Sequence, residues 1–172
     1  MHWYEIDTIE KIDSPSLIVY GSRAKENIDS LIKMVGGNVD QLRPHVKTNK
    51  IAEVCQMMMD EGIRHYKCAT IAEAELLALS EAPDVLISMQ LIGPNLERFK
   101  QLVAHYPKTK FSSIVDDAFA ASELNRIFAD LSTGVYVDLN LGMNRTGITP
   151  DKALALIQHI QALPNVTLRG LH

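Results

Sequence analysis

The chain has 172 residues, of which 47% are hydrophobic and 22% charged, and its net charge at pH 7 is −4. This composition is ordinary for a globular protein that buries a core, and the negative balance argues against a nucleic-acid partner. No window is long and apolar enough to cross a membrane. The N-terminus lacks a signal-peptide pattern, so we expect a cytoplasmic protein in which Cys55 and Cys68 are buried, reduced thiols.

Short apolar runs alternate with helical patterns along the whole chain. The apolar and β-branched runs predict seven strands, at 16–20, 41–46, 65–68, 84–88, 111–115, 134–139 and 166–171. Apolar positions at helical spacing predict a helix between each pair of strands. Thr70 and Glu73 form a capping box, Asp116 is predicted to cap a later helix, and Thr149 precedes a proline that begins the last one.

Strands that alternate with helices predict parallel pairing through right-handed crossovers. Both an open doubly wound sheet and a (β/α)₈ barrel fit this pattern. The barrel is favoured because no Gly-rich dinucleotide loop follows the first strand and because the chain stops on a strand end at 171–172. A complete barrel has typically about 250 residues. We therefore expect residues 1–172 to form one truncated α/β barrel domain of about six β/α units.

Polar residues gather at three of the predicted strand ends. The first group is the run Arg-Pro-His-Val-Lys-Thr-Asn-Lys at 43–50, in which Lys47 stands between a strand and the next helix. A lysine delivered into a cleft at such a junction loses hydration and forms an imine with an aldehyde, which is how pyridoxal 5′-phosphate (PLP) is usually held. A surface lysine in a basic loop is the alternative that spacing alone leaves open.

The other two groups are the loop at 138–147 and His172. Arg145 lies between Gly142 and Gly147, and its planar guanidinium suits a carboxylate or phenolate oxygen, although a solvated turn arginine also fits. His45 is expected to orient a neighbour rather than bind metal, because no second ligand lies at a familiar spacing. The carboxyl ends of parallel strands share one face, so we expect the three groups to converge.

Residues 43–48 resemble the PLP-lysine signature of the D-threonine aldolase and D-serine dehydratase family, part of the barrel PLP enzymes that include alanine racemase. Asn49 replaces the second histidine of that pattern. The segment 142–147, Gly-Met-Asn-Arg-Thr-Gly, is similar to the family's second landmark. Weaker similarities lie at 69–74 and at the strand end Arg-Gly-Leu-His172, so the resemblance spans essentially the whole chain.

This resemblance implies an N-terminal PLP barrel followed by a β-rich domain, which the strand at 16–20 would join. Lys47 would form the imine, and Arg145 would bind the phenolic oxygen of the cofactor or the substrate carboxylate. The other implied site residues contact the cofactor or substrate or support the lysine loop: Arg43, His45, Thr48, Asn49, Asn144 and His172.

The implied activity is that of a PLP-dependent lyase on D-amino acids such as D-threonine or D-serine, by aldol cleavage, dehydration or racemisation. A divalent metal, zinc or manganese, would take its ligands from the C-terminal domain and none from this chain, and a homodimer is expected. Two alternatives stay open. The chain is a non-catalytic PLP-binding module of the homeostasis type, or an inactive fragment of the enzyme.

Overall fold

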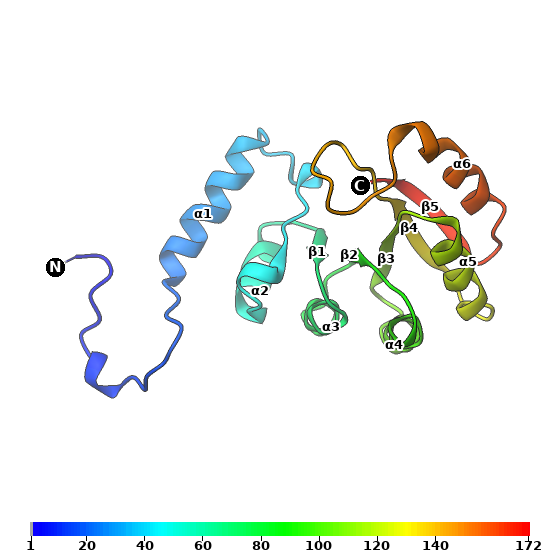
Figure 1. Ribbon diagram of the computed structural model, residues 1–172. Helices are drawn as coiled ribbons and strands as arrows, with labels where there is room; N and C mark the ends of the chain where they lie inside the picture. Colours follow the sequence, from blue (N-terminus) through cyan, green and yellow to red (C-terminus); the bar gives the residue numbers. More distant parts are fainter. Residues whose placement is uncertain (1) are drawn as a thin grey trace.

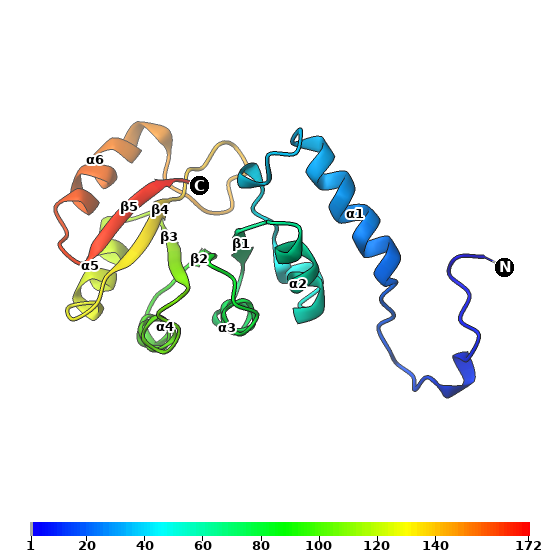
Figure 2. The same cartoon turned by 180° about the vertical axis from the view of Figure 1, so that it is seen from behind.

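The computed structural model describes residues 2–172, and within them one parallel sheet carries helices along its convex side (Figures 1 and 2). The strands are β1 (His65–Cys68), β2 (Asp84–Gln90), β3 (Lys110–Val115), β4 (Thr133–Val137) and β5 (Val166–Leu171). The α-helices are α1 (Gly21–Met34), α2 (Ala52–Asp60), α3 (Ile71–Leu79), α4 (Pro94–His105), α5 (Ala118–Ile127) and α6 (Pro150–Gln161). Short 3₁₀ turns are η1 (Ile9–Lys11), η2 (Val39–Gln41) and η3 (Val46–Thr48).

The strands pair in chain order from β1 to β5, and every pair is parallel. One helix, from α3 to α6 in turn, connects each strand to the next. Consecutive parallel strands require such crossovers, which is why the helices stack along one side of the sheet. The α/β class predicted from the alternating pattern is confirmed.

The polar capping signals begin the helices where expected, with one exception. Thr70 Oγ1 accepts the N–H of Glu73 at 3.1 Å, and Glu73 Oε2 accepts the N–H of Ala69 at 2.7 Å. The prediction that Asp116 caps α5 is wrong, because Asp117 occupies the N-cap and accepts a backbone N–H of the first turn at 2.8 Å. Asp116 instead holds the loop at 138–149, described below.

Two of the seven predicted strands are wrong. Residues 16–20 form no strand, because no strand of the described chain pairs with them. Residues 41–46 contribute only a single bridge, between His45 and Lys67, flanked by η2 and η3. Pro44 has no N–H to give to a ladder, although its carbonyl accepts the N–H of Lys67 at 2.9 Å. The described chain therefore contains five strands, and the bridge at His45 lies where the sequence predicted a further one.

The sheet is strongly curved, so that side chains from its two ends meet. Lys67 lies on β1 and His172 directly follows β5, yet Lys67 Nζ is 2.6 Å from His172 Nε2. Arg43, beside β1, reaches β4, where its guanidinium lies 5.8 Å from the ring centre of Tyr136. In a flat sheet, four strand spacings would separate β1 from β5 by about 19 Å. Only a curl of the kind found in a barrel wall brings these groups together.

The hydrophobic core fills the space between the convex face and the helices. Its centre contains three phenylalanines, with the Phe99 ring 6.4 Å from that of Phe111 and 5.4 Å from that of Phe128. Cys55 and Cys68 are buried and neither is in a disulfide, as expected. No helix of residues 2–172 has the length and hydropathy needed to span a membrane.

Replacement of Phe99 by alanine tests this core. Phe99 is fully buried, so Phe99→Ala should lower the free energy of unfolding by about 3–5 kcal/mol. The matched control is Phe119→Ala, because the Phe119 side chain is 75% exposed and its loss should change stability by less than about 0.5 kcal/mol. Urea unfolding followed by circular dichroism gives both values. Equal losses for the two variants would contradict the described packing.

The cysteines supply a second test of the fold. Burial raises the pKa of the Cys55 thiol to about 11 and that of Cys68 to about 12. Because the thiolate is the reactive form, neither thiol should react with an aromatic disulfide reagent at pH 8 until the protein is unfolded in urea. Rapid reaction of either thiol in the folded protein would show that the core around that cysteine is accessible to the reagent.

Candidate active site

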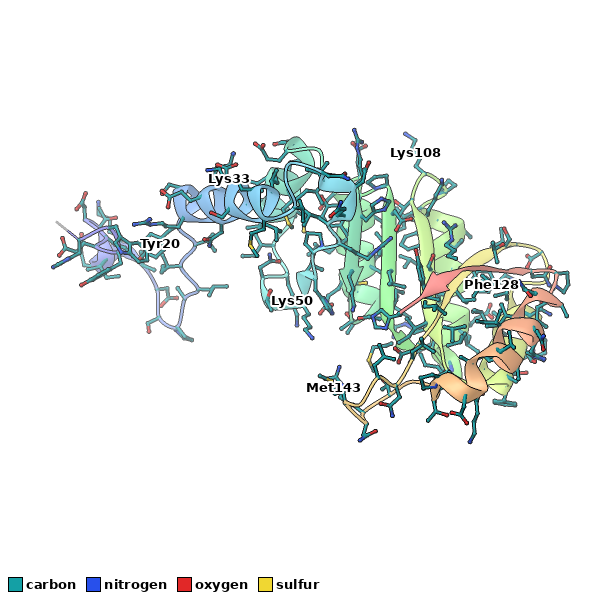
Figure 3. The ribbon with its side chains drawn as sticks, turned by 90° about the horizontal axis from the view of Figure 1, so that it is seen from above. Tyr20, Lys33, Lys50, Lys108, Phe128 and Met143 are labelled. Atoms are coloured by element: carbon teal, nitrogen blue, oxygen red, sulfur yellow. The ribbon has the colours of Figure 1, made fainter. Side chains whose placement is uncertain are left out.

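The polar segments identified in the sequence lie beyond one edge of the sheet. Figure 3 shows Lys50 and Met143, one from each segment, past one edge, and Lys108, which precedes β3, past the opposite edge. The first edge is therefore the one at which the strands end. His172 directly follows β5 and belongs to this carboxyl edge as well. The convergence expected for parallel strands is present.

Lys47 lies in η3, between the bridge to β1 and helix α2. Val46 is fully buried beneath this turn and anchors it. The backbone N–H of Lys47 donates to His45 Nδ1 at 3.3 Å, which restrains the turn from the other side. The Lys47 side chain itself is exposed, so the loss of hydration expected from the sequence is not observed. The turn presents an accessible amine at the carboxyl edge.

His45 links the lysine turn to the sheet. Its Nε2 lies 3.3 Å from Ser88 Oγ, and that hydroxyl donates to the carbonyl of Cys68 at 2.9 Å. Because Nδ1 accepts from Lys47, the remaining proton of a neutral imidazole is on Nε2. Burial, followed by the charges of Lys47 and Lys67, lowers the pKa of His45. The hydrogen bond from Lys47 N–H and the lowered pKa favour a neutral His45 next to the lysine turn; its orienting role stays a prediction.

Lys67 and Asp138 belong to the site, although the sequence analysis did not select them. Lys67 Nζ contacts His172 Nε2 at 2.6 Å, and His172 Nδ1 contacts the buried Asp138 at 2.7 Å. Burial is the main cause of the lowered pKa of Lys67. The charges of Lys47 and Arg145 lower this pKa further, whereas the charge of Asp138 raises it. The alternation of polar and apolar residues at 65–68 was the available signal, but it does not say which face lies inside.

The loop at 138–149 is shaped by Asn140 and a glycine. Asn140 Oδ1 accepts the N–H groups of Gly142 and Asn144, each at 3.1 Å, and its amide donates to Asn144 Oδ1 at 3.0 Å. Gly147 has φ +97°, and a Cβ there would lie 2.6 Å from the backbone nitrogen of Asn140. Its N–H donates to Asp116 Oδ2 at 3.0 Å. Asn144 is thus occupied in holding the loop.

Arg145 is the charged group that this loop presents. With Asp138 and His172 it lines a cavity of about 240 Å³ at the carboxyl edge. The Arg145 side chain is exposed, and none of the ion pairs formed by residues 2–172 includes it. Arg145 lies beside His172, and its charge contributes to the lowered pKa of Lys67 after burial; its binding of an anion stays a prediction.

Three of the predicted residues lie elsewhere. Arg43 points along the concave face towards the strand starts, where it pairs with Asp84 at 2.6 Å and donates to the carbonyl of Tyr66 at 3.1 Å. Thr48 and Asn49 line a separate apolar groove between α1 and α2. Asn49 Oδ1 accepts the N–H at the start of α2 at 3.4 Å. These contacts support the surrounding structure rather than the carboxyl-edge cavity.

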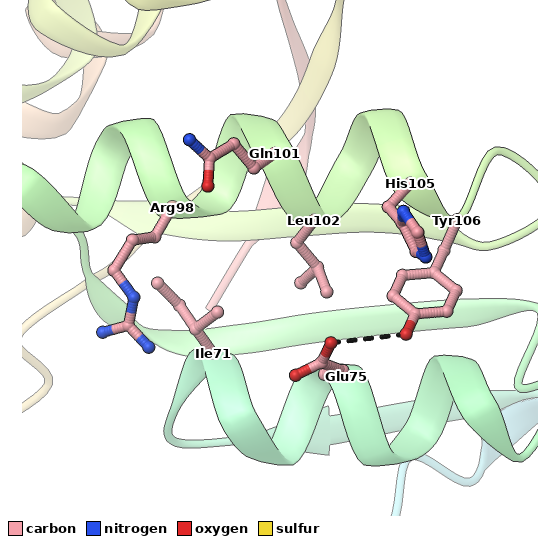
Figure 4. Close-up of a pocket in the computed structure, with 7 residues that line it drawn as sticks. All are labelled: Ile71, Glu75, Arg98, Gln101, Leu102, His105 and Tyr106. Atoms are coloured by element: carbon pink, nitrogen blue, oxygen red, sulfur yellow. Dashed lines mark hydrogen bonds between the residues drawn. The ribbon is translucent and has the colours of Figure 1, made fainter.

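A further cavity of about 300 Å³ lies on the helical side of the sheet, between α3 and α4 (Figure 4). Tyr106 donates a hydrogen bond to Glu75 at 3.3 Å across it, and Arg98 lies at its other end. None of the predicted site residues lines this cavity. Within residues 2–172, no three His, Cys, Asp or Glu side chains gather in a way that would hold a metal ion.

Comparison with known proteins assigns the fold. Residues 20–172 match the family described as "Alanine racemase, N-terminal domain". The chain belongs to this family. The D-threonine aldolase of an Arthrobacter species is 28% identical over 169 residues, which cover 96% of this chain and 44% of that protein. The crystal structure of the D-threonine aldolase from Filomicrobium marinum superposes with a TM-score of 0.84 at 27% identity, over 93% of this chain and 44% of that one.

Other relatives carry related names. The D-threo-3-hydroxyaspartate dehydratase of Delftia sp. (strain HT23) is 24% identical over 88% of this chain and 40% of that protein. The chain thus spans less than half the length of these relatives. Both the resemblance to PLP-dependent barrel enzymes and the partial barrel predicted from the sequence are confirmed.

The residues of this alanine racemase-like barrel fit PLP, which carries an aldehyde, a phosphate and a phenolic oxygen. The accessible amine of Lys47 suits the aldehyde. Lys47 and Arg145 bring positive charge close to Lys67: burial is the main cause of the lowered pKa of Lys67, and these two charges lower it further. The nearby carboxylate of Asp138 accepts a hydrogen bond from His172. A polyanion would relieve this repulsion.

The Arg43–Asp84 pair gives a test of the concave face. Arg43→Met leaves Asp84 without its partner and should cost about 2–3 kcal/mol, less than a fully buried pair because the Arg43 side chain remains 25% exposed. A second change, Asp84→Asn, should recover most of that loss. The control Arg23→Met breaks an exposed pair with Glu26 and should cost less than about 0.5 kcal/mol. Urea unfolding of the parent, of Arg43→Met, of Asp84→Asn and of the double variant completes the cycle. Additive losses would contradict the pairing.

Proposed function

We propose that residues 1–172 are the PLP-binding barrel domain of a lyase that acts on β-hydroxy D-amino acids such as D-threonine or D-serine. The observation that carries the proposal is the convergence of Lys47, Arg145 and His172 at the carboxyl edge, around Lys67. Burial lowers the pKa of Lys67, and the charges of Lys47 and Arg145 lower it further. The names of the similar proteins, D-threonine aldolase and D-threo-3-hydroxyaspartate dehydratase, support the choice of substrate class. Racemisation is a further outcome that the same site allows.

Lys47 is the residue proposed to hold the cofactor covalently. His45 orients its turn through the hydrogen bond from the Lys47 N–H, and Arg145 binds the phenolic oxygen or the substrate carboxylate. When bound, PLP withdraws electrons from the bonds at the substrate Cα. The Lys47 amine is also the group placed to accept or return a proton at that carbon.

The remaining site residues act by supporting this arrangement. Arg43 stabilises the concave face, and Asn144 shapes the Arg145 loop. Asn49 accepts the N–H at the start of α2, and Thr48 lies beside it in the groove between α1 and α2. His172 lies at the wall of the cavity, where it would contact the cofactor.

The setting of the domain is also part of the proposal. Residues 16–20 are extended and exposed, and they would pair with a β-rich domain outside these 172 residues. A divalent metal, zinc or manganese, would take its ligands there, and the assembled enzyme would be a homodimer. The two buried free thiols suit the cytoplasm.

Borohydride reduction of the protein mixed with PLP, followed by peptide mass mapping, tests the cofactor site. We expect a pyridoxyl adduct on Lys47 and its loss in Lys47→Arg, while Lys108→Arg, at the opposite edge, should leave the adduct unchanged. An adduct mainly on another lysine would assign the cofactor to that residue instead. The absence of any adduct in the folded protein would contradict the proposed cofactor site. Release of acetaldehyde from D-threonine or pyruvate from D-serine would separate a lyase from a non-catalytic PLP-binding module or an inactive fragment.

A further inference from the structure

Three side chains form a continuous hydrogen-bonded chain across the mouth of the partial barrel. Lys67 Nζ is 2.6 Å from His172 Nε2, and His172 Nδ1 is 2.7 Å from Asp138 Oδ1. The chain begins on β1 and ends just after β4 and β5. It therefore joins the two ends of the curved sheet at the carboxyl edge, next to Arg145.

The hydrogen-bonding groups of Lys67 and Asp138 determine which ring nitrogen of His172 carries the proton. A lysine ammonium has three donors and no acceptor, so His172 Nε2 must accept from Lys67. A carboxylate only accepts, so His172 Nδ1 must carry the proton that Asp138 receives. One ring nitrogen accepts and the other donates, which describes a neutral imidazole of the Nδ1–H form.

The backbone holds this arrangement in place. The N–H of His172 donates to the carbonyl of Val137 at 2.8 Å, and its own carbonyl accepts from Leu139 at 2.9 Å. Asp138 is 5% exposed, and its second oxygen, Oδ2, has no partner among the described residues. The contact with His172 is therefore the principal stabilisation of a buried carboxylate, which gives the Nδ1–H bond a strong preference.

We propose that Lys67 is a positioning residue: by donating to Nε2 it acts with Asp138 to hold His172 as the neutral Nδ1–H tautomer, with its ring fixed at the wall of the proposed cofactor site. The role of this ring towards PLP rests on the proposed function, whereas the tautomer does not. Both nitrogens of His172 are occupied, so the ring offers its face and edge to a ligand but no proton. Acid–base work at this edge then falls to Lys47.

His45 provides an internal reference of the opposite kind. Its Nδ1 accepts from the Lys47 N–H, and its Nε2 faces Ser88 Oγ, so the neutral ring is of the Nε2–H form. Two histidines of one cavity edge should therefore show opposite tautomers. A general effect of solvent or pH would shift the nitrogen signals of both rings in the same direction. It cannot produce opposite tautomers.

Nitrogen-15 NMR of the histidine-labelled 172-residue chain, without PLP, tests the proposal. Two-bond proton–nitrogen correlations distinguish protonated from accepting ring nitrogens, and His172→Gln and His45→Gln assign the two rings. We expect protonated Nδ1 with accepting Nε2 at His172 and the reverse at His45. A protonated Nε2 at His172 in the unaltered chain would overturn the proposal without any variant.

Two substitutions of Lys67 then separate positioning from simple packing. Lys67→Met keeps much of the side-chain volume but removes the donor, so the bare Nε2 of His172 loses its hydrogen bond. Its nitrogen-15 signal should move away from the protonated range, while Asp138 keeps the proton on Nδ1. Lys67→Arg retains a donor and should restore the hydrogen-bonded Nε2 signal. An unchanged His172 spectrum in Lys67→Met would also overturn the proposal. Because these spectra need no cofactor, a failure here is distinct from a failure to find the adduct on Lys47.

Discussion

The curl of the parallel sheet is the constraint on which the rest of the structure depends. Strands that pair in chain order place β1 and β5 at opposite ends, and only strong curvature lets Lys67 meet His172 at 2.6 Å. The same curvature lets Arg43 cross the concave face to Tyr136. Without it, the polar segments after the strands would form a row along an edge. With this curvature, the polar segments lie around the open carboxyl end of the partial barrel.

The charges on the concave side are divided between paired and unpaired groups. Arg43 is paired with Asp84, whereas Asp138 accepts a hydrogen bond from His172 through one of its two oxygens. The groups that remain at the carboxyl edge are Lys47, Lys67 and Arg145. A chain of net charge −4 thus carries a local positive site, which an average over the composition conceals. An anionic cofactor such as PLP would compensate that charge.

Local sequence signals predicted the repeated β/α units and the two motif segments correctly. Thr70 and Glu73 begin α3, and the glycines around Arg145 allow the turn that a Cβ at Gly147 would block. The same signals failed where the outcome depended on a partner strand. Residues 16–20 are apolar enough for a strand, but a strand exists only when another accepts its hydrogen bonds.

By itself, the sequence determined which residues could do chemistry, because Lys47, Arg145 and His172 are marked by motif and by position after a strand. The tertiary structure alone decided which of them meet. It directed Arg43 to Asp84, sent Thr48 towards α1, and brought Lys67 to His172, which lies 105 residues away in the chain. Those contacts depend on register and curvature, which are set by many residues together, and no local pattern contains that information.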